Sequence, residues 1–246
     1  MHVEFLHQWS EQLGHDMYIN RYGHAGVPIV VFPSQGGKHT EFADFGMVEA
    51  ARHFVESGKV QFFTLSSNDE DTWVANDKHP NDMAKAYNAF DRYVIHEAIP
   101  LIKHKSGWND PMMVSGCSMG AYHAINFFLH HPDVFRGVIA LSGIYDARFF
   151  IGEYGDNEAV YLNSPAEYLW NLEDSWYLDQ YRQSRIIIAT GHGNWEEPGL
   201  PSFYNLKNAF AEKDIPAWFD EWGDDVAHDW EWWRVQYPYF LNQIFG

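Results

Sequence analysis

The chain has 246 residues, of which 46% are hydrophobic and one is a cysteine, and its formal net charge is −18. This composition supplies one large core, so we expect a single domain over 1–246, and it excludes a disulfide-stapled secreted scaffold. The acidic surface argues against nucleic-acid and membrane partners. Because the chain shows no membrane-length apolar run and no signal-peptide pattern, the expected location is the cytoplasm.

Strand patterns alternate with helical patterns along the chain. "VEFLHQWS" and "DMYINRYG" flank a turn and predict an antiparallel hairpin. Apolar runs predict buried strands at "VPIVVFP", "VQFFTLS", "PMMVSG", "GVIALSG" and "RIIIATG", with "PAWFDEW" as a less apolar sixth. Helical patterns cover 42–56, 82–104, 119–130, 164–172, 202–213 and 229–244. The sequence therefore predicts an α/β fold with a mostly parallel central sheet and helices on both faces.

A nucleophile motif follows the strand "PMMVSG". Residues 116–120, Gly-Cys-Ser-Met-Gly, fit G-x-S-x-G and lie between that buried strand and a helical pattern. This is the strand–turn–helix context of a nucleophile elbow, in which the flanking glycines remove side chains that would clash. Ser118 is the predicted nucleophile, and Cys117 is interpreted as a small buried residue.

A serine nucleophile needs a base, and in this architecture the chain order is serine, acid, histidine. The histidines after Ser118 are His123, His130, His131, His192 and His228. His228 lies in a loop between the last strand and the last helical pattern, from which it can reach over Ser118. We therefore predict His228 as the base.

The acid is expected in the loop after "RIIIATG". Glu196 and Glu197 both lie there, and Glu196 is the first choice because Pro198 restricts the backbone of Glu197. Asp224 and Asp225 are rivals, although their closeness to His228 in the sequence makes the approach to its Nδ1 difficult. Glu197 and Asp225 remain the alternative acids.

Acyl transfer also needs donors for the oxyanion of the tetrahedral intermediate. One is the backbone N–H of Met119, which follows the nucleophile. The other is expected from the loop after "VPIVVFP", where Gln35, Gly36 and Gly37 all remain candidates.

Taken together, these segments resemble the esterase D-like group of the α/β-hydrolase superfamily, which includes formylglutathione hydrolases, feruloyl esterases, enterochelin esterases and mycolyl-transferring antigens. The resemblance rests on "PIVVFPSQGG", on "SGCSMGAYHAINFFLHHPDVFRGVIALSG" and on "HDWEWWRVQYPYFL". It implies an α/β-hydrolase fold without a large lid, Ser118 as nucleophile and His228 as base. The sequence departs from the group at the acid, because Gly193 and Asn194 stand where relatives often offer an aspartate. Residues 143–184 are a candidate small cap.

The motifs predict a serine esterase that cleaves carboxylic or thio esters through an acyl-enzyme. Two alternatives remain open: an acyltransferase using the same triad, and a catalytically silent binding module. We expect a small-molecule ester as the partner and no cofactor or metal, since metal-binding spacings such as HExxH do not occur. A homo-oligomer is compatible with the sequence. The aromatic residues of the last helical pattern, including Trp233, are interpreted as its buried stripe.

Overall fold

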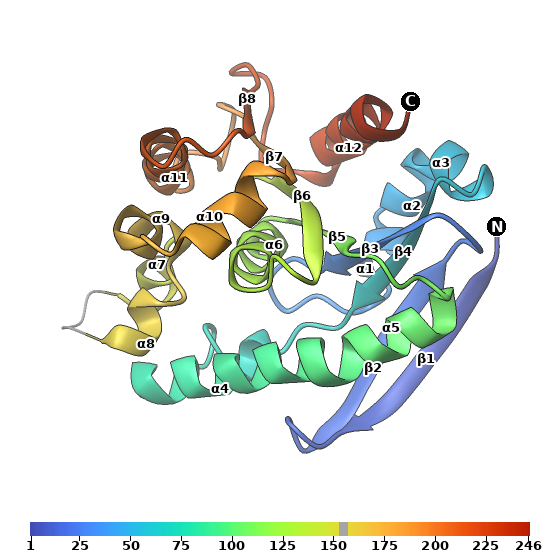
Figure 1. Ribbon diagram of the computed structural model, residues 1–246, viewed down its shortest axis with the longest axis horizontal. Coiled ribbons are helices and arrows are strands. Elements are labelled where there is room, and N and C mark those ends of the chain that lie inside the picture. The colour runs from blue at the N-terminus through green and yellow to red at the C-terminus, as the bar shows by residue number, and fades with distance from the viewer. Residues whose placement is uncertain (153–156) are drawn as a thin grey trace.

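The computed structural model describes residues 1–152 and 157–246. Within them, eight strands form one sheet in the order β1-β2-β4-β3-β5-β6-β7-β8, which in Figure 1 runs from β1 and β2 at the lower right to β8 at the top. The pairs β1–β2 and β2–β4 are antiparallel, and all other neighbours run parallel. The expected hairpin and mostly parallel sheet are therefore confirmed.

The strands follow the apolar runs of the sequence closely. Their bounds are β1 Val3–Ser10, β2 His15–Tyr22, β3 Val27–Phe32, β4 Val60–Leu65, β5 Met112–Cys117, β6 Phe135–Leu141, β7 Arg185–Thr190 and β8 Trp218–Glu221. The five central runs are buried along almost their whole length, as strands covered by helices on both faces must be.

The helices form two layers, one on each face of the sheet. Their bounds are α1 Glu41–Asp44, α2 Met47–Ala50, α3 Arg52–Glu56, α4 Pro80–Tyr93, α5 Ile99–Ser106, α6 Met119–His130, α7 Arg148–Ile151, α8 Glu158–Tyr161, α9 Pro165–Tyr168, α10 Ser175–Arg182, α11 Leu200–Glu212 and α12 Trp230–Phe245. Short 3₁₀ turns cover Asp69–Asp71 and Leu169–Asn171, and a π-helical turn covers Val94–Ala98.

Side chains along the central strands alternate between the two layers. In β3, Val30 and Phe32 pack in the cluster that contains residues of α4–α6 and α9–α11. Ile29 and Val31 pack in the cluster that contains residues of α1–α3 and α12. In Figure 1, α12 accordingly lies near α2 and α3, while α6 lies across the sheet from them. The period-two alternation of strand side chains thus divides the core between the layers.

Two predicted helices are broken in the structure. The pattern over 42–56 forms α1, α2 and α3, because Gly46 between the first two has a φ of 79° that no helix continues through. The pattern over 82–104 forms α4, the π-helical turn and α5. Pro100 lacks the N–H that would donate to the carbonyl of residue 96, which explains the irregular turn before it.

The segment 143–184, expected as a small cap, includes residues 153–156, which lie outside the described residues. Its described part forms α7 to α10 with the 3₁₀ turn over Leu169–Asn171. Tyr145, Tyr168 and Tyr181 are buried in the same cluster as α4 to α6. These aromatic residues therefore contribute to core packing.

Across the described residues, no helix combines the length and the apolar character needed to cross a membrane.

We expect Phe127→Ala to lower the free energy of unfolding by about 3–5 kcal/mol. Phe127 in α6 is fully buried and its ring stacks on Phe32 with 4.7 Å between centroids, so truncation leaves a cavity in the core. Phe149→Ala is the matched control, since that ring is 55% exposed, and it should cost less than about 1 kcal/mol. Urea denaturation measures both, and equal losses would contradict the assignment of Phe127 to the core.

Candidate active site

Ser118 lies on a sharp turn between β5 and α6. Its φ of 56° and ψ of −125° place a residue with a Cβ in a conformation that costs free energy. A Cβ on Gly116 would lie 2.2 Å from the backbone of Gly120, and a Cβ on Gly120 would lie 2.4 Å from the carbonyl oxygen of Phe32. Only glycine fits at these two positions, so the local sequence supports the strained turn.

Backbone strain gathers around this turn. Among the described residues, the non-glycine positions with positive φ are Ser118, Ser142, Trp195 and Asp214. Ser142 follows β6 and hydrogen-bonds Glu196, and Trp195 directly precedes Glu196. Three of these four strained residues therefore lie at the carboxyl ends of β5, β6 and β7, where strain is commonly functional.

His228 lies beside Ser118, as the motif order predicts. Its Nε2 is 2.9 Å from the Ser118 Oγ, across 110 residues of sequence. The His228 backbone N–H donates to the carbonyl of Asn194 at 2.9 Å, which ties the histidine loop to the loop after β7. The next residue, Asp229, caps the first turn of α12. The imidazole is 24% exposed and can therefore meet a molecule entering from solvent.

Glu196 is the carboxylate nearest the other side of the imidazole. Its Oε2 is 3.6 Å from the His228 Nδ1, which is beyond ordinary hydrogen-bond length, although catalytic hydrogen bonds are often long before substrate binds. The Glu196 side chain is only 2% exposed. Its Oε1 accepts from the Ser142 hydroxyl at 2.6 Å, and its Oε2 accepts from the Thr190 hydroxyl at 3.1 Å. These donors compensate for burial of the carboxylate and fix its orientation.

Trp233 and Ser142 are site residues that the sequence reasoning missed. The Trp233 indole N–H donates to the Ser142 Oγ at 2.9 Å, so the Ser142 proton remains available for Glu196. The indole also meets the His228 ring edge-to-face at 5.0 Å. Trp233 is in the buried stripe of α12, as expected, and from there it supports both the histidine and its carboxylate. Ser142 could have been found in the sequence from the "LSG" motif at the end of β6, which places a serine at the carboxyl end of a strand.

None of the rival groups contacts His228 or Ser118 within the described residues. Glu197, Asp224 and Asp225 are all exposed. The other downstream histidines have other neighbours: His123 contacts Asp69, His131 contacts Asp91, His130 contacts the Leu162 carbonyl and His192 contacts Glu221. The structure therefore brings Ser118, His228 and Glu196 together and leaves the alternatives apart.

The loop after β3 lies against the start of α6, because a Cβ on Gly120 would also be 2.5 Å from the Pro33 carbonyl oxygen. Three N–H groups of this loop are already used. Ser34 donates to Glu41, Gly36 donates to Asp69 and Gly37 donates to the Ser34 carbonyl, while Gln35 N–H donates to none of the described residues.

Of the three candidates for the second oxyanion donor, Gln35 is the one whose N–H has no acceptor among the described residues, since the N–H groups of Gly36 and Gly37 have partners. The N–H of Met119, at the first position of α6, has no acceptor among the described residues either. A helix-start N–H of this kind is free to bind a negatively charged oxygen.

Glu41 anchors the beginning of this loop. Its Oε2 and Oε1 accept from the Ser34 N–H and the Ser34 hydroxyl, each at 2.7 Å. Burial raises the pKa of the Glu41 carboxyl, against the opposing effect of the two Ser34 hydrogen bonds. A Cβ on Gly37 would lie 2.4 Å from the Glu41 Oε1, so glycine at 37 makes room for this contact.

Cys117 fulfils the expectation of a small buried residue. It is 2% exposed and packs in the cluster with α12, and burial raises the pKa of its thiol. A protonated, buried thiol is a poor nucleophile.

In the part of the chain that the structure describes, one group of potential metal ligands occurs away from Ser118. Asp91, His130 and His131 bring ligand atoms within 4.8 Å of one another. His131 Nε2 already lies 2.7 Å from the Asp91 Oδ2, and His130 Nε2 already lies 2.8 Å from the Leu162 carbonyl. His130 ends α6, about 18 Å along the helix from Ser118, and His131 and Asp91 of α4 lie beside it, so this group is not part of the site.

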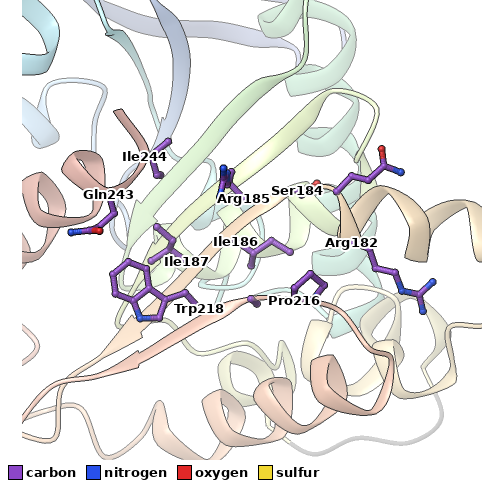
Figure 2. Close-up of a pocket in the computed structure, with 11 residues that line it drawn as sticks. Arg182, Ser184, Arg185, Ile186, Ile187, Pro216, Trp218, Gln243 and Ile244 are labelled. Atoms are coloured by element: carbon purple, nitrogen blue, oxygen red, sulfur yellow. The ribbon is translucent and has the colours of Figure 1, made fainter. Parts of the chain in front are cut away.

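Two described cavities differ in their relation to the site. Figure 2 shows one of about 590 Å³, bordered by Arg185, Ile187 and Trp218 where β7 and β8 begin. Because Ser118 and Glu196 follow strand carboxyl ends, this cavity is at the opposite end of the sheet. A second cavity of about 490 Å³ adjoins Gly36 and Gly37 in the loop after β3.

The family model described as "Putative esterase" matches residues 10–242, and the chain belongs to this esterase family. A ferulic acid esterase is similar in structure, with a TM-score of 0.75 at 19% identity, covering 100% of this chain and 98% of that one.

An S-formylglutathione hydrolase from Agrobacterium tumefaciens gives a TM-score of 0.74 at 16% identity, covering 99% and 95% of the two chains. The fluorophosphonate-binding serine hydrolase F from Staphylococcus aureus gives 0.66 at 15% identity, covering 100% and 98%. No curated protein sequence matches the chain. The structural likenesses confirm the α/β-hydrolase fold, and membership of the esterase family makes the chain a carboxylic ester hydrolase.

We expect native Cys117 to resist alkylation by iodoacetamide, because burial both blocks access and keeps the thiol protonated. The same chain unfolded in guanidinium should take up one label, since it has one cysteine. Mass spectrometry of the intact protein measures the label. Rapid alkylation of the folded protein would contradict the buried position.

Proposed function

We propose that the chain hydrolyses small-molecule carboxylic or thio esters through an acyl-enzyme on Ser118, with His228 as general base and acid and Glu196 as the supporting carboxylate. The observation that carries this proposal is the 2.9 Å separation of the Ser118 Oγ and the His228 Nε2 on a strained strand–helix turn. A nucleophile and base within hydrogen-bond reach, with a carboxylate behind the base, form the arrangement that activates a serine hydroxyl.

In the first half of the reaction, the Ser118 Oγ attacks the ester carbonyl carbon and His228 Nε2 takes the hydroxyl proton. The carbonyl oxygen becomes an oxyanion, which the N–H groups of Met119 and Gln35 would stabilise. The intermediate then collapses, the bond to the alcohol or thiol breaks, and His228 gives its proton to that leaving group. Ser118 is left carrying the acyl group.

In the second half, a water molecule gives a proton to His228 and attacks the acyl carbonyl carbon. Collapse of the second tetrahedral intermediate breaks the bond to Ser118 Oγ, which regains the proton from His228. The carboxylic acid is released. Partial exposure of His228 supports water as the acceptor, because solvent can reach the base directly.

Glu196 is proposed to stabilise the imidazolium that forms in both halves. With Nδ1–H directed toward Glu196, the His228 Nε2 presents a lone pair to Ser118. Ser142 and Thr190 hold the carboxylate on this side of the ring. The cavity beside Gly36 and Gly37 offers room for one part of the ester.

Ser118→Ala should reduce ester turnover by about 10⁴-fold or more while the protein remains folded, because the acyl-enzyme cannot form. The wild type should also bind a fluorophosphonate probe covalently, and the variant should not. Intact-mass spectrometry and turnover of short acyl, feruloyl and formyl-thiol esters measure the two effects. Normal turnover by the purified variant would exclude Ser118 as the nucleophile.

Glu196→Gln should lower kcat at least about 100-fold, because an amide cannot balance the imidazolium charge and favours the wrong tautomer. Glu197→Gln is the matched control, since the neighbouring carboxylate is exposed and has no contact with His228, and its kcat should stay within about twofold of wild type. Steady-state kinetics with active-site titration compares them. Equal effects of the two changes would reject Glu196 as the acid.

A further inference from the structure

A second chain of buried polar groups runs from the nucleophile helix to the loop after β3. Asp69, which follows β4, and His123, in α6, are each 1% exposed. The His123 Nε2 is 3.0 Å from the Asp69 Oδ1, and the His123 Nδ1 is 3.0 Å from the Tyr87 hydroxyl. The other carboxylate oxygen, Asp69 Oδ2, accepts the backbone N–H of Gly36 at 2.8 Å. The mechanism above does not use this network.

Each link in the network has a defined donor. Burial raises the pKa of the Tyr87 hydroxyl, so it stays protonated and can donate to the His123 Nδ1. A neutral His123 then carries its proton on Nε2 and donates it to Asp69. Asp69 consequently receives one hydrogen bond from the nucleophile helix and one from the Gly36 backbone.

The Gly36 N–H belongs to a tight turn over 34–37. The Gly37 N–H donates to the Ser34 carbonyl at 2.9 Å, and Gly36 has a φ of 67° whereas Gln35 has a negative φ. A positive φ confined to the third residue is the mark of a type II turn. In such a turn the central peptide, which contains the Gly36 N–H, can point to either face when nothing holds it.

The hydrogen bond from Gly37 N–H to the Ser34 carbonyl orients the Gln35 N–H. The Gln35 N–H belongs to the peptide whose carbonyl, that of Ser34, accepts from Gly37. In a trans peptide the N–H points opposite to the carbonyl, so Gln35 N–H is directed out of the turn. A flip of the central peptide would turn the Gln35 carbonyl toward the Asp69 carboxylate, which is electrostatically unfavourable. Asp69 thereby selects one conformation of the turn.

We propose that Asp69, oriented by His123, is a positioning residue that anchors the 34–37 turn to α6, so that the outward-directed Gln35 N–H lies where it serves the oxyanion. This inference rests on the proposed function. Asp69 accepts the Gly36 N–H and is itself bonded to His123 of α6. The helix that presents the Met119 N–H is therefore also bonded to the turn that presents the Gln35 N–H. The two donors are held at a constant separation.

Substitutions at His123 and Asp69 test the proposal. His123→Phe keeps a buried ring but removes the Nε2 donor, and Asp69→Asn keeps only one acceptor oxygen, so it cannot accept from His123 and Gly36 through two separate oxygens. Both should lower kcat at least about tenfold, up to the about 10²–10³-fold expected for a lost oxyanion donor, with KM within about twofold. His123→Gln places an amide N–H near the position of Nε2 and should restore kcat to within about threefold of wild type.

Tyr122→Phe is the matched control. Tyr122 neighbours His123 in α6, is fully buried and donates its hydroxyl to the Asn163 carbonyl at 2.8 Å, away from the turn. It should lose thermal stability without losing kcat. The affinity for a trifluoromethyl ketone, whose adduct with Ser118 carries an oxyanion, should fall in parallel with kcat/KM in His123→Phe but not in Tyr122→Phe.

A purely structural role predicts a different pattern. If His123→Phe and Asp69→Asn melt earlier but keep kcat and ketone affinity within twofold of wild type, the positioning role is overturned while the proposed function stands. If Asp69→Asn does not fold, the difference between His123→Phe and His123→Gln decides. A wild-type enzyme without Ser118-dependent turnover would overturn the proposed function and this inference together.

Discussion

The close approach of Gly116 to Gly120, and of Gly120 to the end of β3, is the constraint on which the site depends. Because neither position carries a Cβ, β5, α6 and the loop after β3 can pack closely together. A methyl group at either position would clash with the neighbouring backbone. That contact permits the strained backbone of Ser118 and brings the start of α6 beside the turn over 34–37. The proposed nucleophile and both proposed oxyanion donors therefore depend on the same glycine packing.

Three carboxylates with low solvent exposure lie around the site. Each adds a negative charge to a chain whose formal net charge is already −18. Glu41, Asp69 and Glu196 each accept at least two hydrogen bonds from identified donors. Burying a carboxylate is costly unless such donors are present, and a fully bonded carboxylate has little freedom to move. All three carboxylates therefore have fixed orientations. Glu41 and Asp69 hold the loop after β3, and Glu196 faces His228.

Patterns local in the sequence predicted most of the fold and the strand–turn–helix context of Ser118. Apolar runs located the central strands, alternating segments around a turn located the hairpin, and the glycine-flanked Ser118 required only five consecutive residues and their context. The sequence could not predict contacts between distant segments. Ser142 and Trp233 meet across 91 residues, and Asp69 and His123 meet across 54, so neither pair leaves a local pattern. Gly46 and Pro100 are helix-breaking residues that the sequence shows, but the apolar periodicity on both sides of each led to the prediction of one continuous helix.

Backbone contacts, more than side-chain contacts, determine where His228 and Glu196 lie relative to each other. The loops after β7 and β8 are joined by hydrogen bonds from His192 N–H to the Gly223 carbonyl, from Gly193 N–H to the Val226 carbonyl and from His228 N–H to the Asn194 carbonyl.

A Cβ on Gly191 would lie 2.0 Å from the Val226 carbonyl oxygen, so these loops also approach through glycine. His228 and Glu196, the proposed base and acid, are therefore carried by two loops that are hydrogen-bonded to each other, and their side chains lie 3.6 Å apart. Because Ser142 and Thr190 hold the Glu196 carboxylate, any shortening of this separation depends on the His228 side chain, which is the more exposed of the two.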